Sequence, residues 1–153
     1  MFKYLIFSIF LLNCNASYAQ SYYPYQDIKL VKPSDYKDAE PMALSASTYA
    51  LSTPYKKDDT DKERAMKFLV SWMSGTKEYH FTLQDVGQII MDNHDLFSIY
   101  NAALAKFSIE NKAASVNPKL SRLSAYKLVL IYCDNPANNF KLKKKERKEL
   151  ESN

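Results

Sequence analysis

The sequence predicts an all-α protein, an irregular bundle of four to five helices with an extended N-terminal arm. Apolar residues recur at three- and four-residue intervals in several segments, which is the spacing of amphipathic helices. No segment shows the sustained alternation of polar and apolar residues that is typical of strands, and the chain has only two glycines. Helix patterns joined by short loops favour packing as a bundle.

The first 19 residues have the features of a removable secretory signal. Lys3 supplies a positive charge, and an apolar stretch follows from Tyr4 to Leu12. Small residues stand at Ser17 and Ala19, before a cleavage site that would leave Gln20 as the new terminus. Because the apolar stretch is far shorter than the roughly 20 residues that cross a bilayer, we expect an exported protein without a membrane span.

A lipoprotein signal is the alternative interpretation of the same segment. Leu11 to Cys14 resembles the box in which the cysteine is acylated, but Asn13 stands where Gly, Ala or Ser is usual. A lipid on Cys14 would tether the domain to a membrane. We expect simple cleavage, because the residues before Gln20 match the signal pattern better.

Residues 20–59 are expected to form an extended arm. Pro24, Pro33 and Pro41 are spaced so that they prevent a continuous helix and favour extended backbone. Residues 42–52 allow a short helix that ends before Pro54. The tyrosines of the arm are expected to cover apolar surface while their hydroxyls stay in water: Tyr22, Tyr23, Tyr25 and Tyr36.

The helical domain is expected to span residues 60–140 and to begin with a helix at Thr60. The Thr60 hydroxyl and the Glu63 carboxylate are expected to form a capping box. Gly75 is expected to end the helix in a left-handed conformation. Its apolar stripe comprises Met66, Leu69, Val70 and Met73, with Trp72 also in the core.

Two further helices are predicted in the middle of the domain. Thr82 with Asp85 indicates a second, weaker capping box, and Gly87 on that helix indicates close approach of a neighbouring element. Asp92 or Asn93 caps the longer third helix, which we expect at the centre of the core. The expected buried residues are Leu83, Val86 and Ile90, then Leu96, Ile99, Tyr100, Ala103 and Phe107.

The last helix of the domain is predicted to begin at Asn117, with Pro118 at the first helical position, and to end before Asp134. Lys127 projects into the middle of its apolar arc. Either its methylene stem packs while the ammonium reaches solvent, or it is a desolvated functional lysine. The arc expected to be buried comprises Leu120, Leu123, Tyr126, Leu130 and Ile131.

The basic charge of the chain belongs to its C-terminal tail, residues 141–153. The formal net charge is +4, and residues 141–151 hold six basic against three acidic side chains. We expect this tail to stay solvated, with weak contact to anionic lipid as an alternative to a purely solubilising role. Nucleic-acid-binding proteins normally spread basic residues over a folded face, so we expect no nucleic-acid partner.

The sequence has no catalytic signature. Gly75 and Gly87 stand alone, so no phosphate-binding loop can form, and nucleophile-elbow, HExxH and CxxC motifs are absent. Cys133 ends an apolar helix without a basic neighbour, which indicates a buried small hydrophobe rather than a nucleophile. We therefore expect no catalytic, cofactor-binding or metal-binding residues, and no cofactor.

His80 and His94 are the two imidazoles available for acid–base chemistry. His94 lies in the run from Asp92 to Asp95, which is typical of a helix start and whose neighbours do not converge on one metal. Glu78 and His80 could share one face of an extended segment as an acid–base pair. A small hydrolase using one of these histidines with a carboxylate is therefore an alternative function.

Part of the sequence resembles a group of small exported helical proteins of unknown function from Bacteroidota. The likeness covers residues 60–140, including the long helix from Leu96 to Phe107. It implies a periplasmic address and carries over no activity. The other residues that carry it are Trp72, Thr76, Tyr79, Phe81, Tyr132, Cys133, Asn135, Pro136, Ala137 and Asn138.

The leading hypothesis is a periplasmic, non-enzymatic helical protein that acts by binding another protein of the cell envelope. The first alternative is the small hydrolase that uses a histidine and a carboxylate. The second is an envelope-surface protein whose basic tail contacts lipid.

Overall fold

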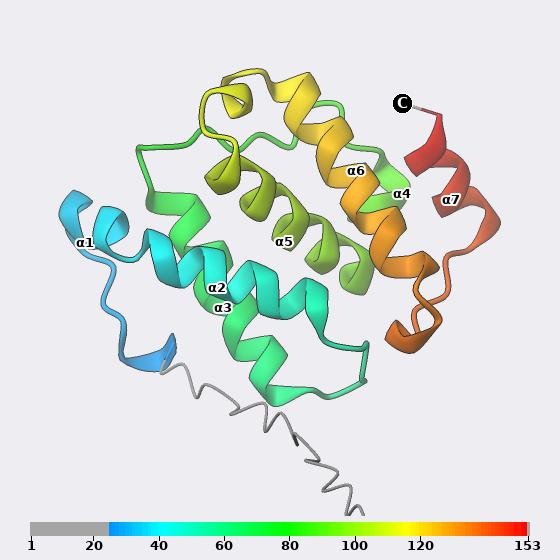
Figure 1. The fold of residues 1–153 in the computed structure, drawn as a ribbon, viewed down its shortest axis with the longest axis horizontal. Helices are drawn as coiled ribbons and strands as arrows, with labels where there is room; N and C mark the ends of the chain where they lie inside the picture. The colour runs from blue at the N-terminus through cyan, green and yellow to red at the C-terminus, as the bar shows by residue number, and fades with distance from the viewer. Residues whose placement is uncertain (1–24, 153) are drawn as a thin grey trace, which may run out of the picture.

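The computed structural model describes residues 25–152, and these residues form seven α-helices and three short 3-10 helices without a strand (Figure 1). The all-α prediction is confirmed, with more helices than the four to five expected. No helix among the described residues is long and apolar enough to cross a bilayer. The predicted signal peptide, residues 1–19, and the arm residues Tyr22 and Tyr23 lie outside the described residues. The elements are η1 Tyr25–Asp27, α1 Pro33–Asp38, α2 Glu40–Ser52, α3 Thr60–Gly75, α4 Gln88–Met91, α5 His94–Glu110, η2 Ala114–Val116, α6 Pro118–Asp134, η3 Pro136–Asn138 and α7 Lys144–Glu151.

Helix α5 forms the centre of the core, as expected. Helices α2 and α6 both pack along it, and α3 packs on α2 and on part of α5 (Figure 1). Leu96 and Tyr100 of α5 are fully buried in one apolar cluster with α4, α6 and α7. Ala102 and Ala105 belong to a second cluster with α2 and α3. Small residues on α2, including Ala43 and Ala46, are fully buried and let it approach α5 closely.

The expected extended arm differs from the structure, because residues 33–52 form two helices that belong to the packed domain. Pro33 and Pro41 occupy the first turns of α1 and α2, where a proline costs no hydrogen bond, and therefore start helices rather than block them. The short helix expected at residues 42–52 is present and begins two residues earlier.

Helix α1 is held against the C-terminal end of α3. The indole Nε1 of Trp72, a fully buried residue as expected, donates a hydrogen bond to the Tyr36 carbonyl at 2.7 Å. The Tyr36 ring covers Gly75, where a β-carbon would lie 2.2 Å from it. Gly75 does not have a positive φ, so the left-handed stop is wrong. Glycine is required at this position because a side chain would clash with the Tyr36 ring.

Asparagine and aspartate side chains cap three long helices. Asn93 Oδ1 accepts from the Leu96 amide, and Asn117 Oδ1 accepts from the Leu120 amide, both at 3.1 Å. The helix start at Asn117 was predicted, and Asn93 is one of the two caps predicted for α5. The capping box at Thr60 is wrong by one residue, because Asp59 occupies the cap position of α3.

The helix predicted from Thr82 is reduced to the four residues of α4. The Thr82 hydroxyl accepts a hydrogen bond from the Gln84 amide and forms a local turn. Asp85 has a φ of 61°, which is incompatible with a right-handed α-helix. The predicted close approach at Gly87 is confirmed, because the Glu149 side chain lies 2.3 Å from where a β-carbon would stand. Leu83, expected in the core, is 48% exposed.

Helix α6 is rotated relative to the expected arc. Leu120 and Ile131 are exposed and Leu123 and Leu130 are half-buried, whereas Tyr126 is buried as predicted. Lys127 is exposed, which contradicts a desolvated lysine at this position. The buried residues of α6 are instead Ser121, Ala125, Tyr126, Val129, Tyr132 and Cys133.

The C-terminal segment differs from the expected solvated tail, since residues 144–151 form the docked helix α7. Leu150 is 3% exposed within the α5–α6 cluster. The buried Glu146 carboxylate accepts from Asn93 Nδ2 at 2.8 Å and from the Lys143 amide at 2.7 Å. The packed unit is therefore longer than residues 60–140.

Candidate functional site

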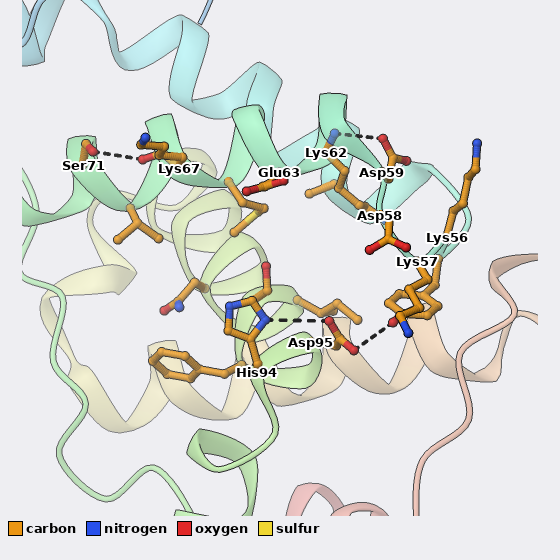
Figure 2. Close-up of a pocket in the computed structure, with 18 residues that line it drawn as sticks. Lys56, Lys57, Asp58, Asp59, Lys62, Glu63, Lys67, Ser71, His94 and Asp95 are labelled. Atoms are coloured by element: carbon orange, nitrogen blue, oxygen red, sulfur yellow. Dashed lines mark hydrogen bonds and ion pairs between the residues drawn. The ribbon is translucent and has the colours of Figure 1, made fainter. Parts of the chain in front are cut away.

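A groove of about 810 Å³ lies between α3 and the N-terminal half of α5, with residues 55–59 at one end (Figure 2). The α3 side repeats at helical spacing, from Glu63 through Met66 and Lys67 to Val70. The α5 side begins at His94 and runs to Asn101. The sequence predicted no groove here, because it depends on how two helices diverge in space.

The floor of the groove is apolar. Met66 and Ile99 are 8% and 6% exposed, and Phe97 is half-buried beside them. Val70, expected in the core, is instead 44% exposed. The exposed Val70 and the half-buried Phe97 give the groove apolar surface that a ligand can cover.

The rims of the groove carry charges of both signs. Lys56, Lys57 and Lys67 are exposed, and so are Glu63 and Asp58 (Figure 2). Because neither sign dominates, the rim suits a ligand with mixed charges better than a phosphate or a polyanion.

A row of polar groups lies at the end formed by residues 55–59. Tyr55 Oη donates to Asp95 Oδ2 at 2.8 Å, and this bond raises the pKa of Tyr55. The other oxygen of Asp95 is 3.8 Å from His94 Nδ1, beyond hydrogen-bond distance, and the imidazole is 98% exposed. Asp95 is thus held by Tyr55, but it does not fix the orientation of His94.

Lys62 lines the groove near this row, and the sequence analysis did not identify it. Its Nζ donates to the carbonyl of Thr53 at 2.9 Å, to that of Pro54 at 3.4 Å and to Tyr132 Oη at 3.0 Å. Burial lowers the pKa of this ammonium, and Asp59 partly opposes the effect. All three ammonium protons are satisfied, so Lys62 joins α2, α3 and α6 rather than presenting a free amine.

A signal for Lys62 was present in the spacing of α3. Lys62, Met66, Leu69 and Met73 follow one another at four, three and four residues, so the buried stripe extends one turn further back than the apolar residues alone suggested. A lysine on that stripe must bury its stem and find acceptors for its charge.

The acid–base pair considered as an alternative at Glu78 and His80 does not form, because Glu78 is bonded to Lys112. Lys112 Nζ donates to Glu78 Oε2 at 2.6 Å and lowers the pKa of that carboxyl. The same ammonium lies 5.1 Å from the centroid of the Tyr79 ring. His80 is exposed and does not line the groove, so the structure does not bring the two histidines into one site.

Cys133 is buried, as expected. Burial raises the pKa of its thiol to about 12, which makes it a poor nucleophile at neutral pH. Within residues 25–152 no group of three or more His, Cys, Asp or Glu side chains has the arrangement of a metal site.

Comparison with protein-family models, with curated proteins and with solved structures finds no match. The groove and the surface of the molecule therefore carry the information on function.

Proposed function

We propose that the protein is an exported, non-enzymatic binding protein that receives a segment of another envelope protein in the groove between α3 and α5. The exposed Val70 above an apolar floor of Met66, Phe97 and Ile99 is the observation that carries this proposal. An apolar centre surrounded by a charged rim is the usual composition of a protein interface.

The dimensions of the groove indicate the length of the bound segment. From Glu63 to Ser71 the wall formed by α3 is about 12 Å long at 1.5 Å per residue. This length fits about two turns of a helix or a few extended residues. The partner would place apolar side chains on the floor and charged side chains on either rim.

Hydrolysis has less support in this groove. A histidine acting as a base needs an orienting partner and a nucleophile within hydrogen-bond distance. The imidazole of His94 is almost fully exposed, and Asp95 is directed to Tyr55 instead.

Selection of peptides from a display library on the immobilised protein tests the proposal. Selected peptides should lose about tenfold or more in affinity for the Val70→Asp variant, because the bound peptide would bury a carboxylate against apolar side chains. The matched control is Val116→Asp, which changes an 81% exposed valine away from the groove. Absence of any Val70-dependent peptide, or equal loss in both variants, would contradict the proposal.

Contact with anionic lipid is a second candidate function, and the docking of α7 favours it. Leu150 and Glu146 face the core, which leaves Lys144, Lys145 and Lys148 exposed on the helix. A lysine near an anionic surface contributes about 1 kcal/mol. Co-sedimentation with vesicles of phosphatidylglycerol should fall in the triple lysine-to-glutamate variant, and equal sedimentation would remove this candidate.

Export to the periplasm is proposed from the N-terminal residues, which lie outside the described part of the chain. The intact mass of the exported protein should correspond to a chain that begins at Gln20 without an acyl group. A mass that fits a lipidated Cys14 would instead place the protein on a membrane.

A further inference from the structure

Three carboxylates from three different elements line one end of the groove between α3 and α5. Asp58 belongs to the segment before α3, Glu63 to the first turn of α3, and Asp95 to the first turn of α5. Figure 2 shows them around the same opening, with Asp95 on the side opposite Glu63. The three do not have the arrangement of a metal site.

Within residues 25–152, no cation of the chain pairs with the carboxylates of Asp58 and Glu63 (Figure 2). The ammonium of Lys62 donates to two backbone carbonyls and a tyrosine hydroxyl instead. Lys56 and Lys57 are exposed on the adjoining loop and form no ion pair with either carboxylate. The negative charge at this end of the groove is therefore available to a cation of the ligand.

Asp95 is held in one orientation by Tyr55, which is fixed in turn by the C-terminal part of the chain. Tyr55 Oη donates to Asp95 Oδ2 at 2.8 Å. The Tyr55 amide donates to the Asn138 carbonyl at 2.7 Å, and its ring meets Phe140 edge-on at 5.2 Å between centroids. Asp95 Oδ1 has no hydrogen-bond donor among the described residues, and the side chain is 50% exposed. This oxygen is thus a positioned acceptor for a donor on the ligand.

We propose, on the basis of the binding function proposed above for the groove, that the bound segment carries a lysine or arginine near an apolar side chain. The apolar side chain lies on Val70, and the basic group lies among Asp58, Glu63 and Asp95. From Glu63 to Val70 the wall of α3 rises about 10 Å at 1.5 Å per residue. This distance corresponds to about three extended residues or two turns of a helix. The methylene stem of the basic side chain packs along the apolar floor between them.

Charge selects the partner here more than it sets the affinity. Ion pairs between exposed side chains are individually weak, because water and salt screen them. Apolar contact with Val70 and Phe97 therefore supplies most of the affinity. An acidic side chain at the same end would be repelled by all three carboxylates. The acidic end thus discriminates between partners and orients the bound segment along the groove.

Peptide selection on the immobilised protein tests this partner chemistry. The Val70-dependent peptides should share a lysine or arginine, and its replacement by glutamine should lower the affinity about fivefold or more. The double variant Glu63→Gln with Asp95→Asn should weaken the basic peptide by a similar factor and leave the glutamine peptide nearly unchanged. Asparagine at position 95 keeps an oxygen that accepts from Tyr55, so the wall stays in place.

Lys67→Gln is the matched control, because Lys67 is an exposed cation on the same wall of the groove. It should leave the affinity of the basic peptide unchanged or raise it. Val70-dependent peptides without a basic residue, or a basic peptide insensitive to the double variant, would overturn the basic partner while the groove remains a binding site. A loss of affinity in Lys67→Gln alone would indicate an acidic partner and also overturn it. Absence of any Val70-dependent peptide would remove both this partner and the proposed function.

Discussion

Replacing Leu150 with alanine tests whether the C-terminal segment belongs to the core. Leu150 is 3% exposed and packs in the cluster that contains Ile90 and Tyr126. Burying a leucine contributes about 1.5–3 kcal/mol, and truncating it to alanine leaves a cavity as well, so Leu→Ala changes in cores cost about 2–5 kcal/mol. Because α7 lies at the edge of the domain and can relax, we expect a loss of about 2–3 kcal/mol.

Urea unfolding followed by circular dichroism measures this loss. The midpoint should fall while the denaturant slope stays the same, since the surface exposed on unfolding hardly changes. Lys148→Ala is the matched control on the same helix, because Lys148 is exposed, and it should change the unfolding free energy by less than about 0.5 kcal/mol. If Leu150→Ala behaves like Lys148→Ala, α7 is not docked and the segment is a solvated tail.

Deletion of residues 141–153 extends the same test. The deletion removes Leu150 together with Glu146, whose carboxylate accepts from Asn93 at the start of α5. We expect a loss of at least about 3 kcal/mol, since a hydrogen bond to a charged group adds about 1.5 kcal/mol or more to the apolar loss. An unchanged melting temperature would contradict the docked helix.

Three further variants test individual contacts by the same unfolding assay. Tyr132→Phe removes the hydroxyl that donates to the carbonyl of Thr53 and should cost about 1–2 kcal/mol, and no loss would contradict the buried hydrogen bonds. Gly75→Ala should cost about 1–3 kcal/mol because a packed ring covers it, whereas Gly87→Ala should be nearly neutral because only a flexible side chain must move; the reverse order would contradict the packing. Burial raises the pKa of Cys133 from 9.0 to about 12, so above about pH 9 the unfolded chain loses a proton that the native protein keeps, and stability should fall by up to about 1.4 kcal/mol per pH unit. The fall should be shallower in Cys133→Ala, and parallel curves would contradict the burial.

Local signals predicted much of the fold. The caps at Asn93 and Asn117 depend on a side chain that bonds an amide three residues later, so the sequence alone contains both partners. The long helix α5 is expected at the core because it has an apolar seam on one face and only small side chains on the other. Prediction failed where a local pattern has two outcomes: Pro33 and Pro41 can interrupt a helix or begin one, and neighbouring contacts decide.

The misplacement of α6 has a different physical cause. Leucines at 120, 123 and 130 formed the most apolar arc, yet the structure turns Ala125 and Val129 toward α5. Small side chains allow the two helices to approach closely, and the hydroxyl of Tyr126 is satisfied by the Gly87 amide at 3.1 Å. Neither the approach nor that partner is visible in one helix alone. For the same reason the groove could not be predicted from the sequence.

The first turn of α5 connects the docked C-terminal helix to the groove. Asn93 caps α5 and donates to Glu146 of α7, while His94 and Asp95, the next two residues, line the groove. Undocking α7 would free the Asn93 side chain and loosen the wall that holds Asp95 against Tyr55. Loss of peptide binding in a variant of α7 would therefore not place the partner on α7. Only a variant such as Lys148→Ala, which alters the exposed side of that helix without changing stability, separates a contact made by α7 from support that α7 gives to the groove.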